Sequence, residues 1–215
     1  MFTGIVQGMA TVESIEKLTG LHRFVMRLPE GLDKDIQIGA SIALNGVCMT
    51  VTSQQKRLVT FDAMAETLNL TSLGDLAVGD PVNVERSARQ GDEIGGHLVS
   101  GHVDGLATVV AVEDTENNRR VTYELPSWAM VYLFRKGFIA LDGCSLTIAE
   151  LDKAQQHLTV SYIPETLRAT VHGVRGVGDK VNFEIDRQTQ AIVDTVKAVI
   201  SENPQMIRDL LRGES

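Results

Sequence analysis

The stretch Met1 to Val12 reads MFTGIVQGMATV, and Leu98 to Val109 reads LVSGHVDGLATV, so the sequence begins again near its middle. Six of these twelve positions are identical at an offset of 97 residues. The second copy carries a histidine, His102, where the first has the aliphatic Ile5. Because a domain commonly holds about 100 to 150 residues, this restart predicts two similar units in a chain of 215 residues.

The repeat continues through the rest of each copy. The block IALNGVCMT at 42–50 matches IALDGCSLT at 139–147, and GDPVNVE at 79–85 matches GDKVNFE at 178–184, where the offset has grown to 99. A surface loop readily absorbs a shift of this size. Blocks that recur in the same order indicate that a whole unit was duplicated. We therefore expect a first domain at residues 1–97, a second at 98–187 and a tail at 188–215.

Within each copy the hydrophobic pattern has a period of two. In the first copy, short segments rich in Val, Ile and Thr occur at 5–15, 21–28, 41–44, 47–52, 58–63 and 81–86. Such segments, bounded by Gly, Pro, Asn and Asp, are typical of β-strands. Asn45-Gly46 and Asp142-Gly143 supply the positive φ angles that tight hairpin turns need. About six strands in roughly 90 residues favour an all-β fold with two tandem, Greek-key-like, six-stranded β-barrels.

Helical segments are few in the two copies. Short helices are expected at 66–70 and at 165–169, and Pro126-Ser127 is a typical start for a helix at 128–134. In the tail, apolar residues recur at helical spacing from Thr189 onward, and a second apolar set follows Pro204. A one-sided apolar helix after two complete domains must either dock on a barrel or pair with copies of itself, and we favour self-association. The two sets are Ile192, Val193, Val196, Val199 and Ile200, and then Ile207, Leu210 and Leu211.

Composition argues against several classes of partner. The formal net charge is −8 and Lys and Arg form no run, whereas nucleic-acid binding needs clustered cations. No segment approaches the roughly 18 apolar residues of a membrane span, and the first residues lack the pattern of a secretory signal. Cys48 and Cys144 lie in separate copies, so a reduced, cytoplasmic protein is expected. His97 and His102 have no accompanying Cys, Asp or Glu cluster, so no metal is expected.

Positions that differ sharply between the copies are candidates for a role that only one copy performs. They are Ile5/His102, Gly39/Lys136, Ser41/Phe138, Cys48/Ser145 and Ser87/Asp186. His102 is a candidate general base, because an ordinary imidazole has a pKa of about 6.5, and the alternative is a histidine facing solvent at the start of a strand. Lys136 and Asp186 fit a solvated ion pair.

The two hairpin segments carry polar side chains one pleat apart. Cys48 and Thr50 share one face of their strand, and so do Ser145 and Thr147, because alternate residues of a strand point the same way. Such pairs suit the edge of a heterocycle or a polyhydroxyl chain. The alternative is that they are ordinary strand residues, and that Cys48 is a small buried residue.

Several motifs together resemble a known family. They are MFTGIVQG at 1–8, GDEIGGHLVSGHVDG at 91–105, LDGCSLT at 141–147, the ETL and GDxVNxE blocks in both copies, and IDRQTQAIVDTV at 185–196. These motifs occur in the order found in riboflavin synthases of the alpha-chain type, and the resemblance covers residues 1–200. It implies two similar six-stranded barrels and a C-terminal helix through which three chains assemble.

The resemblance also implies a reaction. Such enzymes move a four-carbon unit between two molecules of 6,7-dimethyl-8-ribityllumazine, which yields riboflavin and 5-amino-6-ribitylaminouracil in the last step of riboflavin biosynthesis. One substrate molecule is the donor and the other the acceptor, so neither a metal nor a redox cofactor is expected. The site is implied to form between the first barrel of one subunit and the second barrel of its neighbour. Association with lumazine synthase stays open.

Site residues follow from the same resemblance. Catalytic roles are implied for His102, Cys48, Ser145, Lys136 and Asp186. Substrate contacts are implied for Phe2, Thr3, Gly4, Ile5, Val6, Ser41, Met49, Thr50, Asp62, Ala63, Met64, Ala65, Glu66, Thr67, His97, Gly101, Val103, Leu146, Thr147, Tyr162, Ile163, Pro164, Glu165 and Thr166. We expect His102 to act with Ser145 and Thr147 on protons in the second barrel. Cys48, Ser41 and Thr50 are then expected to hold or activate the other molecule in the first barrel.

Three other classes of protein stay open. A lumazine-binding or flavin-binding antenna protein would depart from the polar set of the second barrel, all of which is present here. A flavin-dependent reductase would need a nucleotide-binding α/β domain, and no βαβ pattern follows the barrels. A purely structural β-repeat protein would have no activity. Incubation with the dimethyl lumazine alone distinguishes the four classes, because only the synthase forms yellow riboflavin without a reductant.

Overall fold

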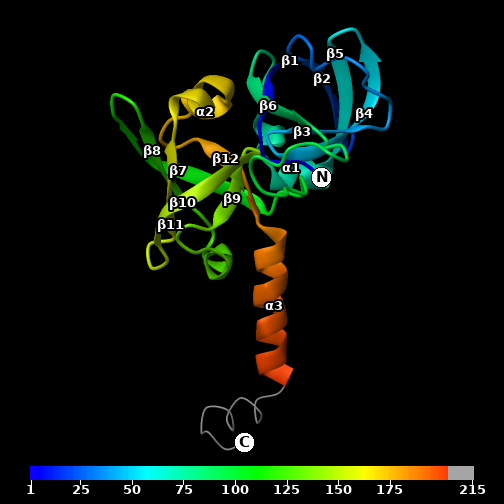
Figure 1. Cartoon of the computed structure of the whole chain (residues 1–215). Coiled ribbons are helices and arrows are strands. Elements are labelled where there is room, and N and C mark those ends of the chain that lie inside the picture. The colour runs from blue at the N-terminus through cyan, green and yellow to red at the C-terminus, as the bar shows by residue number, and fades with distance from the viewer. Residues whose placement is uncertain (203–215) are drawn as a thin grey trace, which may run out of the picture.

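Two closed antiparallel β-barrels and a long C-terminal helix make up the computed structural model, which describes residues 1–202 (Figure 1). The first barrel contains β1 (Gly8–Leu18), β2 (Leu21–Arg27), β3 (Ser41–Leu44), β4 (Val47–Gln55), β5 (Leu58–Met64) and β6 (Pro81–Arg86). The second contains β7 (Gly105–Asp114), β8 (Arg119–Glu124), β9 (Phe138–Leu141), β10 (Cys144–Asp152), β11 (His157–Tyr162) and β12 (Lys180–Ile185). The strands run β1-β2-β5-β4-β3-β6 around the first barrel and β7-β8-β11-β10-β9-β12 around the second. The predicted all-β fold with two similar six-stranded barrels is confirmed.

The first strand differs from its sequence prediction. Strand β1 begins at Gly8, not at residue 5, because the preceding residues leave the first barrel. The carbonyl of Gly4 accepts a hydrogen bond of 2.8 Å from Ser145 N of the second barrel, and Val6 packs against the second core. The alternating pattern therefore correctly marks Val6 as buried, but the second barrel buries it and not the first.

Each barrel encloses its own hydrophobic core, built from the alternate, inward-facing residues of its strands. The first core is wholly apolar around Phe24 and Phe61, whereas the second contains Tyr123 and Tyr162. The two tyrosine hydroxyls lie 2.7 Å apart, so one donates a hydrogen bond to the other away from water. Burial raises the pKa of both phenols, so both stay neutral over the ordinary pH range.

Short helices cover one end of each barrel. Helix α1 (Ala65–Leu70) and the 3-10 turn η1 (Ser72–Asp75) follow β5, while α2 (Pro164–Ala169) and η3 (Val171–Gly173) follow β11. Both predicted helices are confirmed to within a residue at each end. The helix expected at 128–134 is a 3-10 helix, η2 (Ser127–Tyr132). We call α1 and α2 the site helices, since both lie in segments that the sequence predicts to contact substrate.

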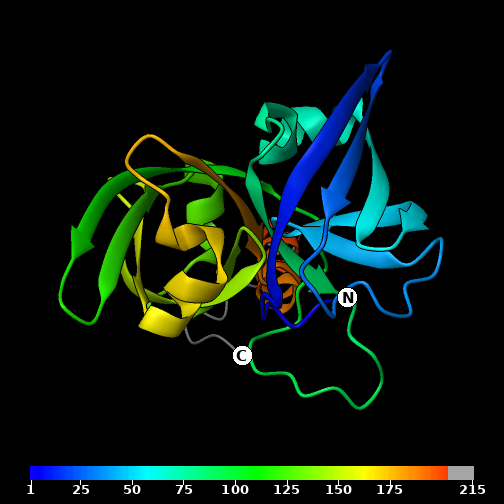
Figure 2. The ribbon, with the colours of Figure 1, turned by 90° about the horizontal axis from the view of Figure 1, so that it is seen from above.

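The tail forms α3 (Arg187–Glu202), which runs away from the barrels and is seen end-on between them in Figure 2. Asp186 caps its first turn, because Asp186 Oδ1 accepts from Thr189 N at 2.8 Å and from Thr189 Oγ1 at 2.7 Å. The second apolar set, Ile207, Leu210 and Leu211, lies outside the described residues. Within residues 1–202, no helix is long and apolar enough to cross a membrane.

The barrels meet across an approximate twofold relation. Phe2 N donates to Val99 O at 2.8 Å, and Val99 N donates to Phe2 O at 3.0 Å. These side chains form a small buried cluster with Ala43 and Ala140, which occupy matching positions in the two copies. The connection between the barrels runs from the end of β6 at Arg86 to the start of β7 at Gly105, and the expected domain boundary after residue 97 falls within it.

Candidate functional site

Each barrel is completed by the leading segment of the other copy. Cys48 N on β4 donates to Gly101 O at 2.9 Å, and Ser145 N on β10 donates to Gly4 O at 2.8 Å. Val103 is part of the first hydrophobic core, although it precedes the second barrel in sequence. We define the first half-site as β4, β5 and α1 with residues 101–103. The second half-site is β10, β11 and α2 with residues 4–6.

Two buried glutamates hold these crossing segments in place. Glu85 Oε1 accepts from Thr3 N and Thr3 Oγ1 at 2.6 and 2.8 Å, and its Oε2 accepts from Gly4 N at 3.1 Å. Glu184 repeats the arrangement with Ser100 N and Oγ at 2.7 Å and Gly101 N at 2.9 Å. Burial raises the pKa of Glu85, and the hydrogen bonds from residues 3–5 oppose that shift.

Sequence reasoning assigned no role to these glutamates. The signal was present, because the GDxVNxE block ends in Glu at the same point of both copies. A charged residue in a strand is ordinarily exposed, however, and only the placement of β6 and β12 between the barrels buries both carboxylates. Each glutamate therefore positions the backbone that completes the half-site of the opposite barrel.

The second half-site contains a histidine and serine pair. His97 Nδ1 lies 2.6 Å from Ser145 Oγ, and the His97 ring stacks on Phe138 with ring centres 5.2 Å apart. Burial lowers the pKa of His97, and the negative charge of Asp186 opposes that shift. The ring is therefore neutral at pH 7, where one of its nitrogens is an acceptor. Such a pair is able to take a proton from the hydroxyl or return one to it.

Within one chain the backbone beside His102 lies against the first barrel, and the expected grouping of His102 with Ser145 and Thr147 stays a prediction. Gly101 contacts Cys48 of the first barrel, so the neighbouring His102 lies at the first half-site. Its described hydrogen bonds use only its backbone, which accepts from Arg187 and donates to Ser100 Oγ. The His102 side chain is exposed to solvent.

The hairpin side chains follow the predicted faces. Cys48, Thr50, Ser145 and Thr147 lie on the outer faces of β4 and β10, half-buried or exposed. Met49 and Leu146 alternate with them and point into the two cores. The first residues of each pair, Cys48 and Ser145, contact the crossing backbone of Gly101 and Gly4.

Other predicted residues have structural partners. Asp62 forms a two-point ion pair with Arg23 at 2.8 and 3.1 Å, and the exposed Glu165 pairs with Arg168 at 2.6 Å. The Tyr162 side chain lies in the second core, which leaves its backbone to reach a ligand. The described ion pairs do not join Lys136 to Asp186, so that expectation is wrong, and Asp186 caps α3 instead.

The remaining predicted residues fall on these same segments. Ala63 points into the first core, so only its backbone is able to reach a ligand. Exposed or half-buried positions are held by Met64, Ala65, Glu66 and Thr67 on the first barrel and by Ile163, Pro164 and Thr166 on the second. Ser41 lies opposite Thr50 in the β3 and β4 pairing. Phe2 is wholly buried between the barrels and touches the backbone of Gly101, so it supports a half-site from behind.

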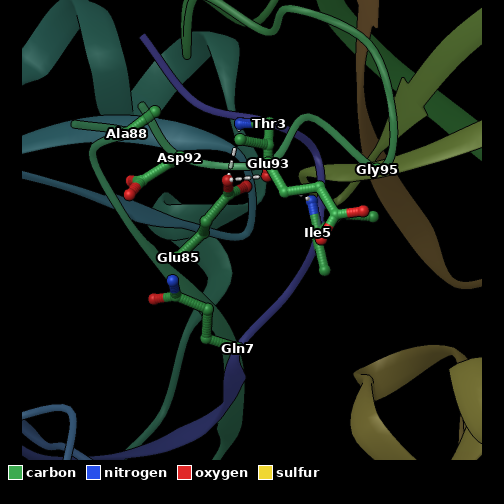
Figure 3. Close-up of a pocket in the computed structure, with 8 residues that line it drawn as sticks. All are labelled: Thr3, Ile5, Gln7, Glu85, Ala88, Asp92, Glu93 and Gly95. Carbon is green, nitrogen blue, oxygen red and sulfur yellow. Dashed lines mark hydrogen bonds between the residues drawn. The ribbon is translucent and has the colours of Figure 1, made fainter. Parts of the chain in front are cut away.

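Three pockets lie near these residues. The pocket in Figure 3 has a volume of about 560 Å³ and is lined by Thr3, Ile5, Gln7, Glu85, Ala88, Asp92, Glu93 and Gly95. Smaller pockets of about 260 and 340 Å³ include Ser41 and Ala65, respectively. None of the three contains residues of both half-sites. In residues 1–202, no group of three or more His, Cys, Asp or Glu side chains is arranged to hold a metal ion.

Comparison with known proteins agrees with the duplicated architecture. The lumazine binding domain family matches twice, at residues 3–87 and 100–186. Riboflavin synthase of Escherichia coli strain K12 is 48% identical over 202 residues, which cover 94% of each chain. Riboflavin synthase of Bacillus subtilis strain 168 is 41% identical over 189 residues, covering 86% of this chain and 85% of that relative.

Solved structures of LumP are also similar. LumP complexed with riboflavin superposes with a TM-score of 0.81 at 26% identity, covering 87% of this chain and 100% of LumP. LumP complexed with 6,7-dimethyl-8-(1'-D-ribityl) lumazine gives a TM-score of 0.79 at 26% identity with the same coverage. The identity to LumP is thus about half of that to the Escherichia coli riboflavin synthase.

Proposed function

Because the chain belongs to the riboflavin synthase family, with two lumazine-binding domains, we propose that it converts two molecules of 6,7-dimethyl-8-ribityllumazine into riboflavin and 5-amino-6-ribitylaminouracil. It is a transferase that moves a four-carbon unit from one lumazine to the other. The observation that carries this function is the pair of half-sites, which share one backbone frame but differ in their polar side chains. Two identical substrates with opposite roles need such a pair.

The second half-site is suited to proton transfer. The reaction requires the methyl group on C7 of one lumazine to lose a proton, while C7 of the other accepts a nucleophile. The neutral His97 beside Ser145 Oγ supplies a proton acceptor next to a hydroxyl, at a distance of 2.6 Å. We assign Ser145, with Thr147 one pleat further, to the lumazine bound by the second barrel. We assign Lys136 and Asp186 to the rim of this half-site, because Lys136 N donates to Ile148 O of β10 and the charge of Asp186 acts on His97.

The first half-site holds the other lumazine. Cys48 and Thr50 project from the outer face of β4, and His102 joins them through the crossing of residues 101–103. Backbone groups of residues 62–67 and 162–166 bind the rings and ribityl chains at the two half-sites. Closing the two half-sites on each other holds both rings in one geometry, which accelerates a bimolecular reaction by orientation.

Three chains complete the enzyme in this proposal. Helix α3 carries exposed Ile192, Val196 and Ile200 on one side, and its contacts to the barrels of its own chain are few, with Tyr132 Oη to Asp194 Oδ1 at 2.6 Å among them. Assembly through this helix brings the first half-site of one subunit against the second half-site of a neighbour. The free thiols of Cys48 and Cys144 agree with a cytoplasmic location, and association with lumazine synthase stays a prediction.

Turnover of the dimethyl lumazine alone tests the function. The purified chain should form riboflavin without a reductant, measured by absorbance, and Ser145→Ala should lower the rate at least about tenfold. Ser127→Ala, an exposed serine on η2 of the same barrel and outside both half-sites, is the matched control and should keep the wild-type rate. Ligand binding without turnover by the wild-type chain would instead identify an antenna protein.

Two further variants test the individual assignments. Near-normal turnover of His102→Gln would remove His102 from the chemistry and leave the function intact. Ile192→Asp places a charge on the apolar side of α3, and it should reduce both the mass measured by light scattering and the rate. Ala198→Asp, on the opposite side of the helix, is its control. An active Ile192→Asp monomer would rule out the shared site.

A further inference from the structure

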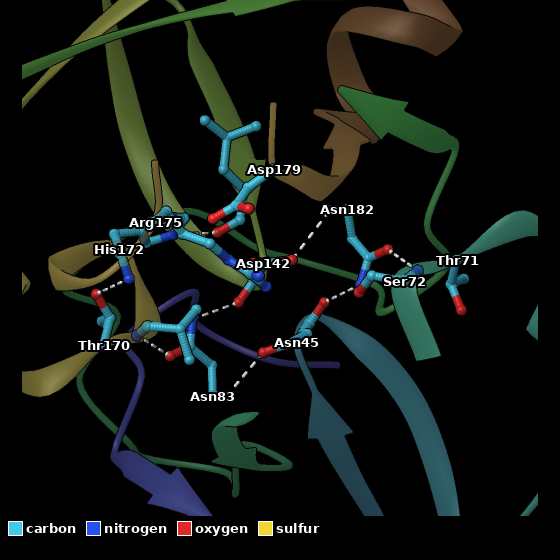
Figure 4. A network of polar contacts seen from close by, with 12 residues as sticks. Asn45, Thr71, Ser72, Asn83, Asp142, Thr170, His172, Arg175, Asp179 and Asn182 are labelled. Carbon is cyan, nitrogen blue, oxygen red and sulfur yellow. Dashed lines mark hydrogen bonds and ion pairs between the residues drawn. The ribbon is translucent and has the colours of Figure 1, made fainter. Parts of the chain in front are cut away.

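Two asparagines join the barrels through both ends of their side chains (Figure 4). Asn83 Nδ2 on β6 donates to Asp142 O of the second barrel at 2.9 Å. Asn182 Nδ2 on β12 donates to Asn45 O of the first barrel at 2.8 Å. All four residues are buried, and they occupy matching positions of the two copies. The donor end of each amide therefore ties its strand to the hairpin turn of the opposite barrel.

The acceptor end of each amide reaches a different element. Asn182 Oδ1 accepts from Ser72 N at 2.8 Å, and Asn83 Oδ1 accepts from Val171 N at 2.8 Å. Ser72 and Val171 are the first residues of η1 and η3, directly behind the site helices α1 and α2. The site helix of each barrel is thus held by a side chain from the other barrel.

A short path leads from each amide to a predicted ligand contact. Thr71 precedes Ser72, and its Oγ1 donates to Thr67 O at 2.7 Å, at the end of α1. Thr170 precedes Val171, and its Oγ1 donates to Thr166 O at 2.7 Å, at the end of α2. One backbone step and one hydrogen bond therefore separate each cross-barrel amide from the half-site.

Because the hydrogen bonds to Asn182 and Asn83 are buried, they determine where the ends of the site helices lie. Ser72 and Val171 are buried, so water does not replace a lost acceptor for either backbone amide. If the acceptor were removed, the amide would have to find a new partner, and the end of the site helix would move with it. The asparagines are not required for the strand pairing itself, because their side chains point away from the barrels that contain them.

We propose that Asn182 is a positioning residue for ligand binding in the first half-site, and Asn83 for binding in the second. Each fixes the site helix of the opposite barrel, and with it Thr67 or Thr166. Lumazine binding in one barrel then depends on a residue of the other barrel in the same chain. This inference rests on the proposed function, since it requires a lumazine or flavin site in each barrel.

A titration that reports on each half-site separately tests the inference. Riboflavin is added to the full-length, isotope-labelled protein, and the backbone amide signals of Thr67 and Thr166 give one dissociation constant for each half-site. Asn182→Ala should raise the constant from Thr67 about tenfold and change that from Thr166 by less than about twofold. Asn83→Ala should do the reverse, so each variant is the control for the other. Equal changes at both half-sites, or at neither, would overturn the proposal, because a merely structural loss weakens both alike.

The wild-type protein provides a second test that does not depend on the folding of a variant. The side-chain amide signals of Asn182 should shift along the same binding curve as Thr67, and those of Asn83 along the curve of Thr166. Signals that follow the opposite curves, or stay in place while both half-sites fill, would contradict the proposal. Absence of riboflavin binding at either half-site would instead overturn the proposed function, and the inference with it.

Discussion

The two barrels hold their site helices with the same hydrogen bonds, but different side chains surround those bonds. The matching positions are Leu73 and His172, Leu76 and Arg175, and Asn45 and Asp142. The first barrel is apolar or neutral at all three, whereas the second carries three ionisable groups. Asp142 pairs with Arg175 at 3.0 Å, and the His172 ring stacks on Tyr162 with centres 4.8 Å apart. The two copies thus share a frame, namely the hydrogen bonds that hold η1 and η3 behind the site helices, and differ in the side chains around it.

This difference makes the frame of the second barrel sensitive to pH. Burial raises the pKa of Asp142 to about 6, and Arg175 opposes the shift. Burial lowers the pKa of His172 to about 4. Asn45, the counterpart of Asp142 in the first barrel, does not ionise, and its Nδ2 has no hydrogen-bond partner among the described residues. Matching variants of the shared hydrogen bonds should have matching effects in the two barrels, while variants of the surrounding ionisable groups should affect the second barrel alone.

Disruption of the shared contact between the hairpin tips should have the largest effect. A Cβ at Gly46 would lie 2.6 Å from Gly143 N, and a Cβ at Gly143 would lie 2.8 Å from Gly46 N. Backbone atoms of a closed barrel cannot yield as a flexible side chain does. Gly46→Ala should therefore lower the free energy of unfolding by more than about 3 kcal/mol, measured by urea denaturation, or prevent folding.

Gly20→Ala is the matched control for this variant. Gly20 has a φ of +74°, close to the +79° of Gly46, but nothing lies within 4 Å of its added Cβ. Its substitution should cost only the backbone strain, about 1 to 2 kcal/mol. Equal losses in Gly20→Ala and Gly46→Ala would show that the contact between the barrels contributes nothing beyond that strain.

Removal of Arg175 should have the next largest effect, and the effect should grow with pH. A carboxyl with a raised pKa binds more protons in the folded state, so Asp142 makes the protein less stable as pH rises from about 4 to about 6. Without Arg175 the pKa of Asp142 rises further, and the penalty for ionising it increases. Arg175→Leu, which copies Leu76, should cost about 3 kcal/mol at pH 8 and about 1 kcal/mol at pH 5, measured by urea denaturation.

His172, the other ionisable group beside Arg175, also makes the stability loss of Arg175→Leu smaller at pH 5 than at pH 8. A histidine with a lowered pKa costs stability as pH falls from about 6.5 to about 4, and the charge of Arg175 contributes to that lowering. Arg175→Leu relieves part of this cost at acidic pH, which again makes its loss smaller there. Arg120→Leu breaks the exposed Arg120–Glu150 pair of the same barrel and should change little at either pH. A loss for Arg175→Leu that is equal at pH 5 and pH 8 would contradict the role given to Asp142.

Most of the fold follows from the sequence because the strands repeat a local signal. Alternating Val, Ile and Thr between turn residues marks each strand, and Asn45 and Asp142 take the positive φ angles of 45° and 42° that their hairpins require. Five of the six predicted strands of the first barrel begin at the predicted residue. The start of β1 was predicted wrongly because the alternating pattern indicates that Val6 is buried but does not indicate which barrel buries it.

The candidate site was less predictable for the same reason. The repeat identified His102 as a position at which the copies differ, but its barrel depends on the crossing of residues 101–103. Glu85 and Glu184 were visible as identical residues, yet their burial depends on the contact between the barrels. His97 has no counterpart in the first copy, so its contact with Ser145 Oγ could not be inferred from the repeat.

The smallest effect is expected where the two barrels are identical. Thr71 Oγ1 and Thr170 Oγ1 each donate at 2.7 Å to the end of a site helix and each accept at 3.3 Å from the second residue that follows. Thr71→Val and Thr170→Val keep the side-chain shape and remove both hydrogen bonds. Each should lower the free energy of unfolding by about 1 to 1.5 kcal/mol in urea denaturation at pH 7, with a difference between them of less than about 0.5 kcal/mol. Thr11→Val, an exposed position on β1, is the control and should change stability little. If Thr170→Val cost over about 1 kcal/mol more than Thr71→Val, the divergence around His172 and Arg175 would extend into the frame itself, and the two barrels would not share one.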